Sequence, residues 1–187
     1  MSYTGNKKRS YKALLITIAA VLSVILLLFL CMQMAKNKAI GLEEQIATAK
    51  SNIDVQQKRR ADLIPNLVEC VKAYDKHEYE TLLAIVQARG VNSDQDVAQV
   101  QTTIAAVAEA YPELKSSENY RNLMIELAST ENQIAQYRNN YNAQVRNYNR
   151  TVRQFPNSFF LSTLGYEPIE YNYLEFDTTP DAPQVIF

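Results

Sequence analysis

The sequence has 187 residues, enough for one ordinary domain and a membrane segment. Its 19 basic and 20 acidic residues give a formal net charge of −1, so it lacks the basic excess that nucleic-acid binding requires. Four glycines and six prolines are few helix breakers, and the composition therefore predicts an all-α fold with long helices.

An apolar segment near the N-terminus predicts a transmembrane helix. Residues 13–32 carry no charge and contain only Thr17 and Ser23 as hydroxyl residues. A helix of that length rises about 30 Å, which crosses the hydrocarbon core of a bilayer. A cleaved signal peptide has a shorter apolar region and a small-residue cleavage site, which is missing here. We therefore expect a basic N-terminus over residues 1–12 and a transmembrane helix over 13–34.

The charges that flank this segment indicate its orientation in the cell membrane. Four basic residues precede it and three follow it closely: Lys7, Lys8, Arg9, Lys12, Lys36, Lys38 and Lys50. The surplus favours an N-terminus inside and a body outside.

The body, residues 35–155, is predicted to be a helical bundle. Apolar residues recur with helical spacing over 35–74, where Pro65 is expected to kink the helix without ending it. Asp75 and Glu78 have the spacing of a capping box, which begins a second helix ending near Arg89. A third helix begins near Asp94 and stops at Pro112, and a fourth follows from Ser116 or Ser117.

The fourth helix carries a sustained heptad pattern. Large apolar or aromatic residues lie seven apart at Tyr120, Leu127, Ile134, Tyr141, Tyr148 and Phe155. Such a repeat is typical of a coiled-coil seam. Because the first and fourth helices are long and the other two are short, we expect an up-and-down bundle of two long and two short helices. The long pair would continue toward the membrane as a two-helix stalk.

Several separate motifs in order resemble those of the LemA family. They are Ile53–Gln56, Lys58–Glu69, Ala108–Lys115, Ser129–Asn132, Tyr141-Asn142, Tyr148-Asn149 and Phe155-Pro156. The resemblance covers roughly residues 33–187 and implies an N-terminal membrane helix followed by a four-helix bundle of bromodomain-like mirror topology, in a bacterial cell membrane. The resemblance does not imply a particular biochemical activity, because the family has no agreed one. Members have been described with the N-terminus outside, so the orientation stays open.

The sequence favours a protein that is not an enzyme and has no cofactor. His77-Glu78-Tyr79-Glu80-Thr81 begins like a zinc-protease motif, but threonine stands where the second imidazole is needed and no other histidine exists. We therefore predict no catalytic, cofactor-binding or metal site.

Charged residues on the apolar faces of the long helices form a candidate site. Glu131 and Arg138 occupy heptad positions, and Arg60 and Asp54 lie on or beside the stripe of the first helix. Aligning the two helices antiparallel sets Arg60 opposite Glu131 and Asp54 opposite Arg138. We interpret these residues as a structural polar layer that fixes the register, with a binding site as the alternative.

Aromatic residues mark two further regions. Tyr137, Tyr141 and Tyr148 are expected on a part of the fourth helix that only the first helix covers, which makes them candidates for self-association. Residues 156–176 are rich in large rings and include a predicted short amphipathic helix, 157–164. This segment either lies at the membrane–water boundary or packs back on the bundle.

The last residues, 177–187, form a predicted extended tail. Pro180 and Pro183 exclude a helix interior, and Pro183, Val185 and Phe187 fall on one side of an extended chain. Such a tail can add to a sheet edge of a partner. A disordered tail is the alternative.

These observations predict a membrane-anchored helical scaffold or adaptor. We expect it to contact membrane lipid, to form a homo-oligomer and to dock a membrane protein partner, without binding nucleic acid. The alternative is a regulatory or substrate-presenting subunit of a membrane enzyme such as a protease.

Overall fold

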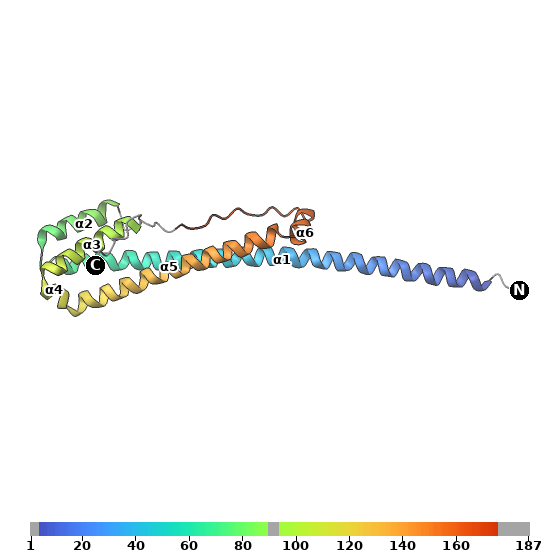
Figure 1. Ribbon diagram of the computed structural model, residues 1–187, viewed down its shortest axis with the longest axis horizontal. Helices are drawn as coiled ribbons and strands as arrows, with labels where there is room; N and C mark the ends of the chain where they lie inside the picture. Colours follow the sequence, from blue (N-terminus) through green and yellow to red (C-terminus); the bar gives the residue numbers. More distant parts are fainter. Residues whose placement is uncertain (1–3, 90–93, 176–187) are drawn as a thin grey trace, which may run out of the picture. The chain divides into compact units, whose positions relative to one another are not determined.

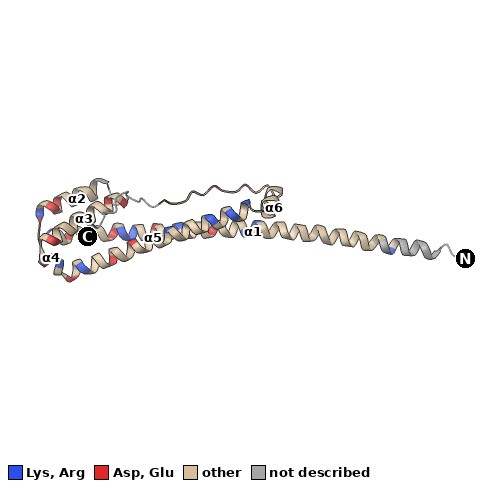
Figure 2. Cartoon of the chain, in the orientation of Figure 1, with Lys and Arg blue, Asp and Glu red and all other residues tan. Residues whose placement is uncertain are grey.

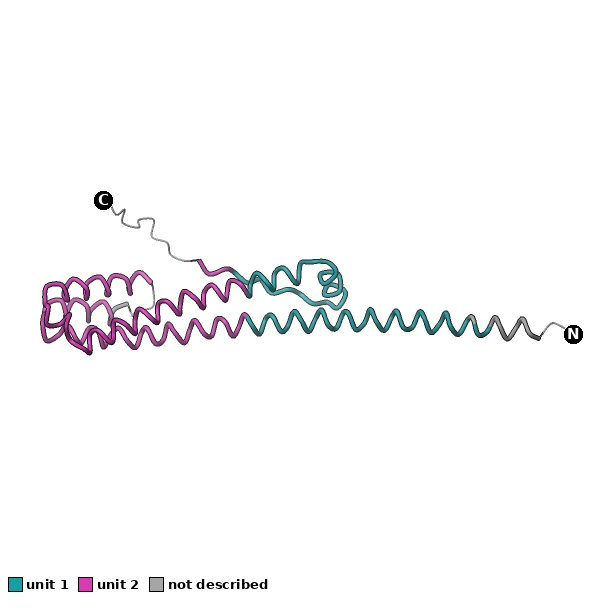
Figure 3. Tube along the Cα trace, turned by 60° about the horizontal axis from the view of Figure 1, so that its bottom comes forward, with its two compact units in different colours: residues 1–45, 144–172 teal, residues 46–143, 173–187 magenta. Residues whose placement is uncertain are grey.

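A computed structural model describes residues 4–89 and 94–175 of the chain (Figure 1). The described residues form helices and no strand, as the composition predicted. The helices are α1 (Thr4–Val71), α2 (Lys76–Arg89), α3 (Asp94–Ala110), α4 (Pro112–Ser116), α5 (Glu118–Arg153) and α6 (Asn157–Thr163). They divide into two compact units, residues 1–45 with 144–172 (unit 1) and residues 46–143 with 173–187 (unit 2), coloured in Figure 3.

Helix α1 joins the predicted membrane segment and the first body helix in one element of 68 residues. Pro65 lies inside it, as expected from the apolar stripe that resumes after the proline. Every described side chain from Leu14 to Leu30 is exposed. Within the described residues this is the one helix long and apolar enough to cross a membrane. The exposed apolar surface is consistent with a membrane anchor.

Unit 2 is built around an apolar core to which α1, α2, α3, α4 and α5 all contribute. The core contains Leu63, Ile64, Leu67, Val68, Val71, Leu82, Val97, Val100, Ile104, Val107, Ala108, Leu114, Tyr120 and Leu127. Asp75 caps α2, as predicted, because its side chain accepts a hydrogen bond of 3.0 Å from the backbone N–H of Glu78. The short helix α4 was not predicted; Pro112 begins it instead of only stopping α3.

Unit 1 contains the N-terminal part of α1, the last turns of α5, and α6 with the segment that follows it. Its buried apolar residues are Ala35, Ala39, Val145, Tyr148, Val152 and Leu161. Helix α6 ends at Thr163, and Gly165, two residues later, has a φ of 66°, the left-handed conformation that glycine adopts without strain.

The heptad pattern of α5 correctly predicts which side chains are buried as far as Val152. Tyr120, Leu127, Ile134, Tyr141, Val145, Tyr148 and Val152 are all buried. Phe155, the next in the series, is instead 79% exposed. The reason is that α5 ends at Arg153, so the helical period no longer applies beyond it.

Candidate functional site

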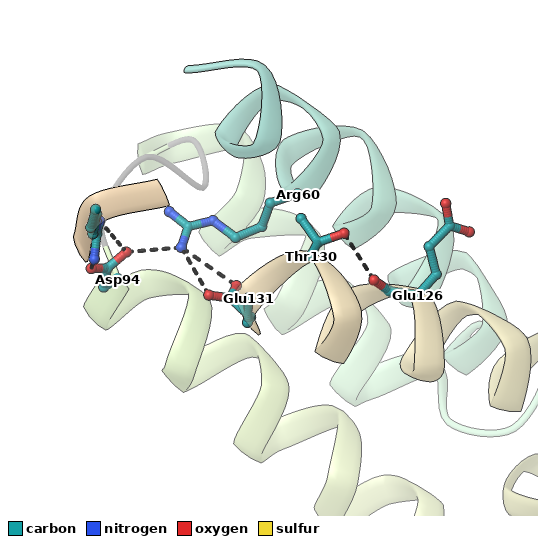
Figure 4. A network of polar contacts seen from close by, with 6 residues as sticks. Arg60, Asp94, Glu126, Thr130 and Glu131 are labelled. Atoms are coloured by element: carbon teal, nitrogen blue, oxygen red, sulfur yellow. Dashed lines mark hydrogen bonds and ion pairs between the residues drawn. The ribbon is translucent and has the colours of Figure 1, made fainter. Parts of the chain in front are cut away.

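A charge network in unit 2 joins α1, α3 and α5 (Figure 4). Arg60 of α1 is only 1% exposed, and its Nη1 donates a hydrogen bond of 2.8 Å to Oδ1 of Asp94. The same nitrogen lies 3.4 Å from both carboxylate oxygens of Glu131. None of the described residues accepts a hydrogen bond from the buried Nε of Arg60. Arg60 therefore depends on the two carboxylates for the compensation that a buried cation needs.

Asp94, the first residue of α3, is shared between two arginines. Arg138 of α5 donates to Oδ2 of Asp94 over 2.7 Å and to Oδ1 over 3.3 Å, while Arg60 uses Oδ1. The hydrogen bonds from Arg138 are the largest cause that lowers the pKa of Asp94, and Arg60 acts in the same direction against partial burial. Asp94 is therefore a carboxylate at neutral pH, and it ties the start of α3 to both long helices.

The predicted polar layer is partly reproduced and partly wrong in its pairing. Arg60 does lie against Glu131, as the antiparallel alignment of the long helices indicated. Asp54, however, is exposed, and Arg138 pairs with Asp94 instead. The prediction considered only the two long helices, and the third helix brings its first residue between them. An acidic residue at a helix start was visible in the sequence, but it was interpreted only as part of a helix start signal.

A second polar cluster in unit 1 surrounds Tyr148 of α5, which is 0% exposed. Its hydroxyl lies 2.9 Å from the hydroxyl of Tyr166 and 3.2 Å from Oε1 of Glu43, and it accepts a 2.9 Å hydrogen bond from the backbone N–H of Ile169. Tyr166 also donates to Oε1 of Glu43. The ring of Tyr148 packs edge-on against Tyr171, with centroids 5.2 Å apart. These contacts hold the segment after α6 onto α1 and α5.

Both phenols in this cluster are neutral. Burial is the largest cause that raises the pKa of Tyr148 and of Tyr166, and the hydrogen bond to Glu43 raises that of Tyr166 further. Two phenols that stay protonated can donate hydrogen bonds, but they provide no base or nucleophile at neutral pH. Their hydrogen bonds instead link segments of the chain that are distant in sequence.

The burial of these tyrosines corrects the predicted self-association surface. Tyr148 and Tyr141 are both buried inside a single chain, and only Tyr137 of the three is partly exposed. The sequence argument assumed that α1 alone covers this part of α5. The segment after α6 also packs over Tyr148, through Tyr166, Ile169 and Tyr171, in agreement with the alternative that residues 156–176 pack back on the bundle.

Unit 2 also holds the chain just before the predicted tail. The side chain of Asn142 donates to the backbone carbonyl of Leu174 and accepts from its backbone N–H, each over 2.8 Å. The predicted docking residues Pro183, Val185 and Phe187 lie outside the described residues. The structure thus shows where the segment 173–175 is fastened and leaves the tail itself a prediction.

The part of the chain that the structure describes contains no group of three or more His, Cys, Asp or Glu side chains arranged to hold a metal ion. Both clusters instead link helices to one another. An all-helical body on an exposed apolar helix is the architecture of a membrane-associated helical protein.

The chain belongs to the LemA family, because the model of that family matches residues 49–187. The match confirms the family resemblance seen in the motifs.

Among curated proteins the chain is similar to Protein LemA of Metamycoplasma hominis, with 28% identity over 132 residues, which is 64% of this chain and 60% of that protein. It is also similar to Magnetosome protein MamQ of Magnetospirillum gryphiswaldense, with 29% identity over 84 residues, or 44% of this chain and 31% of that protein. Magnetosome protein MamQ 2 of Paramagnetospirillum magneticum is 32% identical over 68 residues, 36% of this chain and 25% of that protein. The chain thus spans less than two thirds of each relative.

Proposed function

We propose that this protein is a non-enzymatic, membrane-anchored scaffold or adaptor that self-associates at the membrane surface and docks partner proteins. The observation that supports it best is the continuity of α1. Its exposed apolar stretch, Leu14–Leu30, belongs to the same helix as the core residues Leu63–Val71 of unit 2. Because the body continues directly from its anchor helix, it stays at the bilayer surface. Confinement to that surface raises its effective concentration toward partners in the same membrane.

The finer architecture is part of the proposal. We infer an up-and-down four-helix bundle of bromodomain-like mirror topology, with the N-terminus inside and the body outside the cell membrane, as the flanking charges favour. The relatives named as magnetosome proteins and as LemA support a membrane-associated role without naming a partner for this chain.

Self-association requires exposed apolar surface, and Val55 and Ile125 of unit 2 provide it. Ile125 on α5 is 68% exposed, and Val55 on α1 is also exposed. Arg59, one turn after Val55, bonds at 2.6 Å to Glu126, the neighbour of Ile125. The ion pair therefore joins the two helices beside both apolar side chains. These residues replace Tyr141 and Tyr148 as the first candidates for contact between copies.

We expect the full-length chain to be oligomeric in mild detergent and Ile125→Ser to weaken the assembly. Burial of a side chain of this size contributes about 1.5–3 kcal/mol, so the dissociation constant should rise roughly tenfold or more. Mass measured by light scattering across a concentration series checks this. Gln136→Ser changes an exposed polar side chain of the same helix and is the matched control. A monomeric wild type at high concentration contradicts self-association, and a monomer that co-purifies with one enzyme supports the role of a regulatory or substrate-presenting subunit instead.

The tail is the second proposed contact. Deleting Val185, Ile186 and Phe187 should abolish capture of the partner and leave the thermal midpoint of the helical body unchanged, because the deletion removes none of the buried residues that form the apolar core. Affinity capture from native membranes, with the full-length and truncated chains side by side, measures it. Capture of the same proteins by both chains would show that the tail has no docking role.

A further inference from the structure

Helix α6 lies at the end of the apolar span. In unit 1, Glu43 of α1 contacts Tyr148 of α5, and the two helices run in opposite directions (Figure 1). Equal rise per residue then places Arg153, the last residue of α5, beside about residue 38 of α1. Figures 1 and 3 both show α6 beside α1, farther toward the N-terminus of α1 than the end of α5. Helix α6 therefore lies on the side of residue 38 that leads into the apolar stretch of α1.

Burial along α1 supports this placement. Side chains from Leu14 to Leu30 are exposed, whereas Cys31, Met32 and Gln33 are partly covered and Ala35 is buried. The covering of α1 begins where the apolar stretch ends. Any bilayer that surrounds the stretch must have its surface at this level.

Two phenylalanine rings at this level are largely exposed among the residues that the structure describes. Phe155 is 79% exposed and Phe159, four residues later, is 59% exposed, while Leu161 of the same helix is buried. Leu161 thus packs α6 against the rest of unit 1, and the rings of Phe155 and Phe159 face away from it. An exposed pair of rings costs free energy in water, and burial in lipid would remove that cost.

Polar and basic groups accompany the rings. Arg150 and Arg153 are in the last turn of α5, and Figure 2 shows basic residues along that end of the helix. Arg153 also borders a cavity of about 590 Å³ that Ser158, Ser162 and Glu167 line. Segments at the boundary of acyl chains and headgroups are typically rich in aromatic rings and basic side chains. The rings insert into the lipid and the cations bind the phosphates.

We propose that α6 is an interfacial lipid-binding element: Phe155 and Phe159 insert into the acyl–headgroup boundary of the phospholipid bilayer that the apolar stretch of α1 spans. This rests on the membrane anchorage in the proposed function. A helix of seven residues binds lipid weakly alone, but the anchor holds it at the surface and makes the contact effectively intramolecular. The element fixes how the anchored protein sits on the bilayer.

The absence of tryptophan from the sequence allows a direct test. Phe159→Trp and, in a separate chain, Phe155→Trp each introduce a sole tryptophan into the full-length protein. Each is reconstituted into vesicles of phosphatidylethanolamine and phosphatidylglycerol, and its fluorescence is quenched by iodide from the water or by lipids brominated at chosen depths. Leu22→Trp reports on the anchor, and Gln99→Trp is an exposed control on α3, outside unit 1.

We expect several-fold weaker iodide quenching of Phe159→Trp than of Gln99→Trp, with the strongest lipid quenching from bromines near the headgroup. Leu22→Trp should be quenched best by bromines deep in the acyl chains. Iodide quenching of both Phe155→Trp and Phe159→Trp at the level of Gln99→Trp overturns the inference. So does protection from iodide without lipid quenching, which would mean that protein covers the rings. If Leu22→Trp also escapes lipid quenching, the anchorage fails and not only the role of α6.

Discussion

Replacing Asp94 with alanine is expected to lower the free energy of unfolding of the helical body by about 3 kcal/mol. The substitution removes the 2.8 Å bond to Arg60 and the 2.7 Å bond to Arg138, and it leaves the buried Arg60 with Glu131 alone at 3.4 Å. Breaking a buried pair costs about 3–5 kcal/mol, and partial exposure of Asp94 places the loss at the low end. Denaturant unfolding in mild detergent, followed by circular dichroism, measures it.

Two comparisons isolate the network. Asp54→Ala removes an exposed carboxylate that the antiparallel alignment of the long helices had set against Arg138, and it should cost less than about 0.5 kcal/mol. In an Arg60→Met background there is no buried cation to leave unpaired, so Asp94→Ala should cost at least about 1 kcal/mol less than in the wild type. Equal costs in both backgrounds would show that Arg60 and Asp94 are not energetically coupled.

The pH dependence of stability follows from the lowered pKa of Asp94. Its ordinary value is 3.8, so ionised Asp94 stabilises the folded chain above that pH, and the contribution is lost as the pH falls through the lowered pKa. Between about pH 2 and 5, wild-type stability should decline more steeply than that of Asp94→Asn, which cannot titrate there. Parallel curves would contradict this role.

Replacing Tyr148 with alanine should have an effect of similar or greater size. The ring is fully buried against Tyr171, and truncation of a buried ring costs about 3–5 kcal/mol. Tyr148→Phe keeps the ring and removes only the hydroxyl, which leaves the N–H of Ile169 without its acceptor at a cost of about 1–3 kcal/mol. Unfolding in mild detergent gives both values.

Hydrogen exchange locates the second effect. The Ile169 amide should exchange faster in Tyr148→Phe than in the wild type, because its acceptor is gone. Tyr173→Ala, an exposed tyrosine of the same segment, is the control and should change stability by less than about 0.5 kcal/mol. An unchanged exchange rate at Ile169 would show that Tyr148 does not fasten the segment.

The sequence predicted burial on α5 well because the heptad repeat is a local property of one helix. Tyr141 and Tyr148 were correctly placed on the apolar face, but their role was misjudged. Local periodicity says that a face is covered and does not say by which segment. The segment after α6 has no helical period, so nothing in its pattern indicated that Tyr166 and Ile169 would reach Tyr148.

The charge network also shows that a pattern within the long helices does not reveal which other segment packs against them. Arg60 and Glu131 were paired correctly because two antiparallel helices with one fixed point have a calculable register. Asp94 begins α3, and no repeat in the two long helices encodes the position of that third helix. Pro112 is a further example. It was predicted only to stop the third helix, but it also begins α4, because proline favours the first turn of a helix.

The two hydrogen bonds between Asn142 and the backbone of Leu174 limit how far from α5 the C-terminal residues can extend. Leu174 is held beside Asn142 of α5, and the twelve residues 176–187 span at most about 40 Å when fully extended. A binding surface for Val185–Phe187 must lie inside that radius. For such a surface the tether acts as a high local concentration, and moving the fastening point along α5 would change affinity without altering any contact.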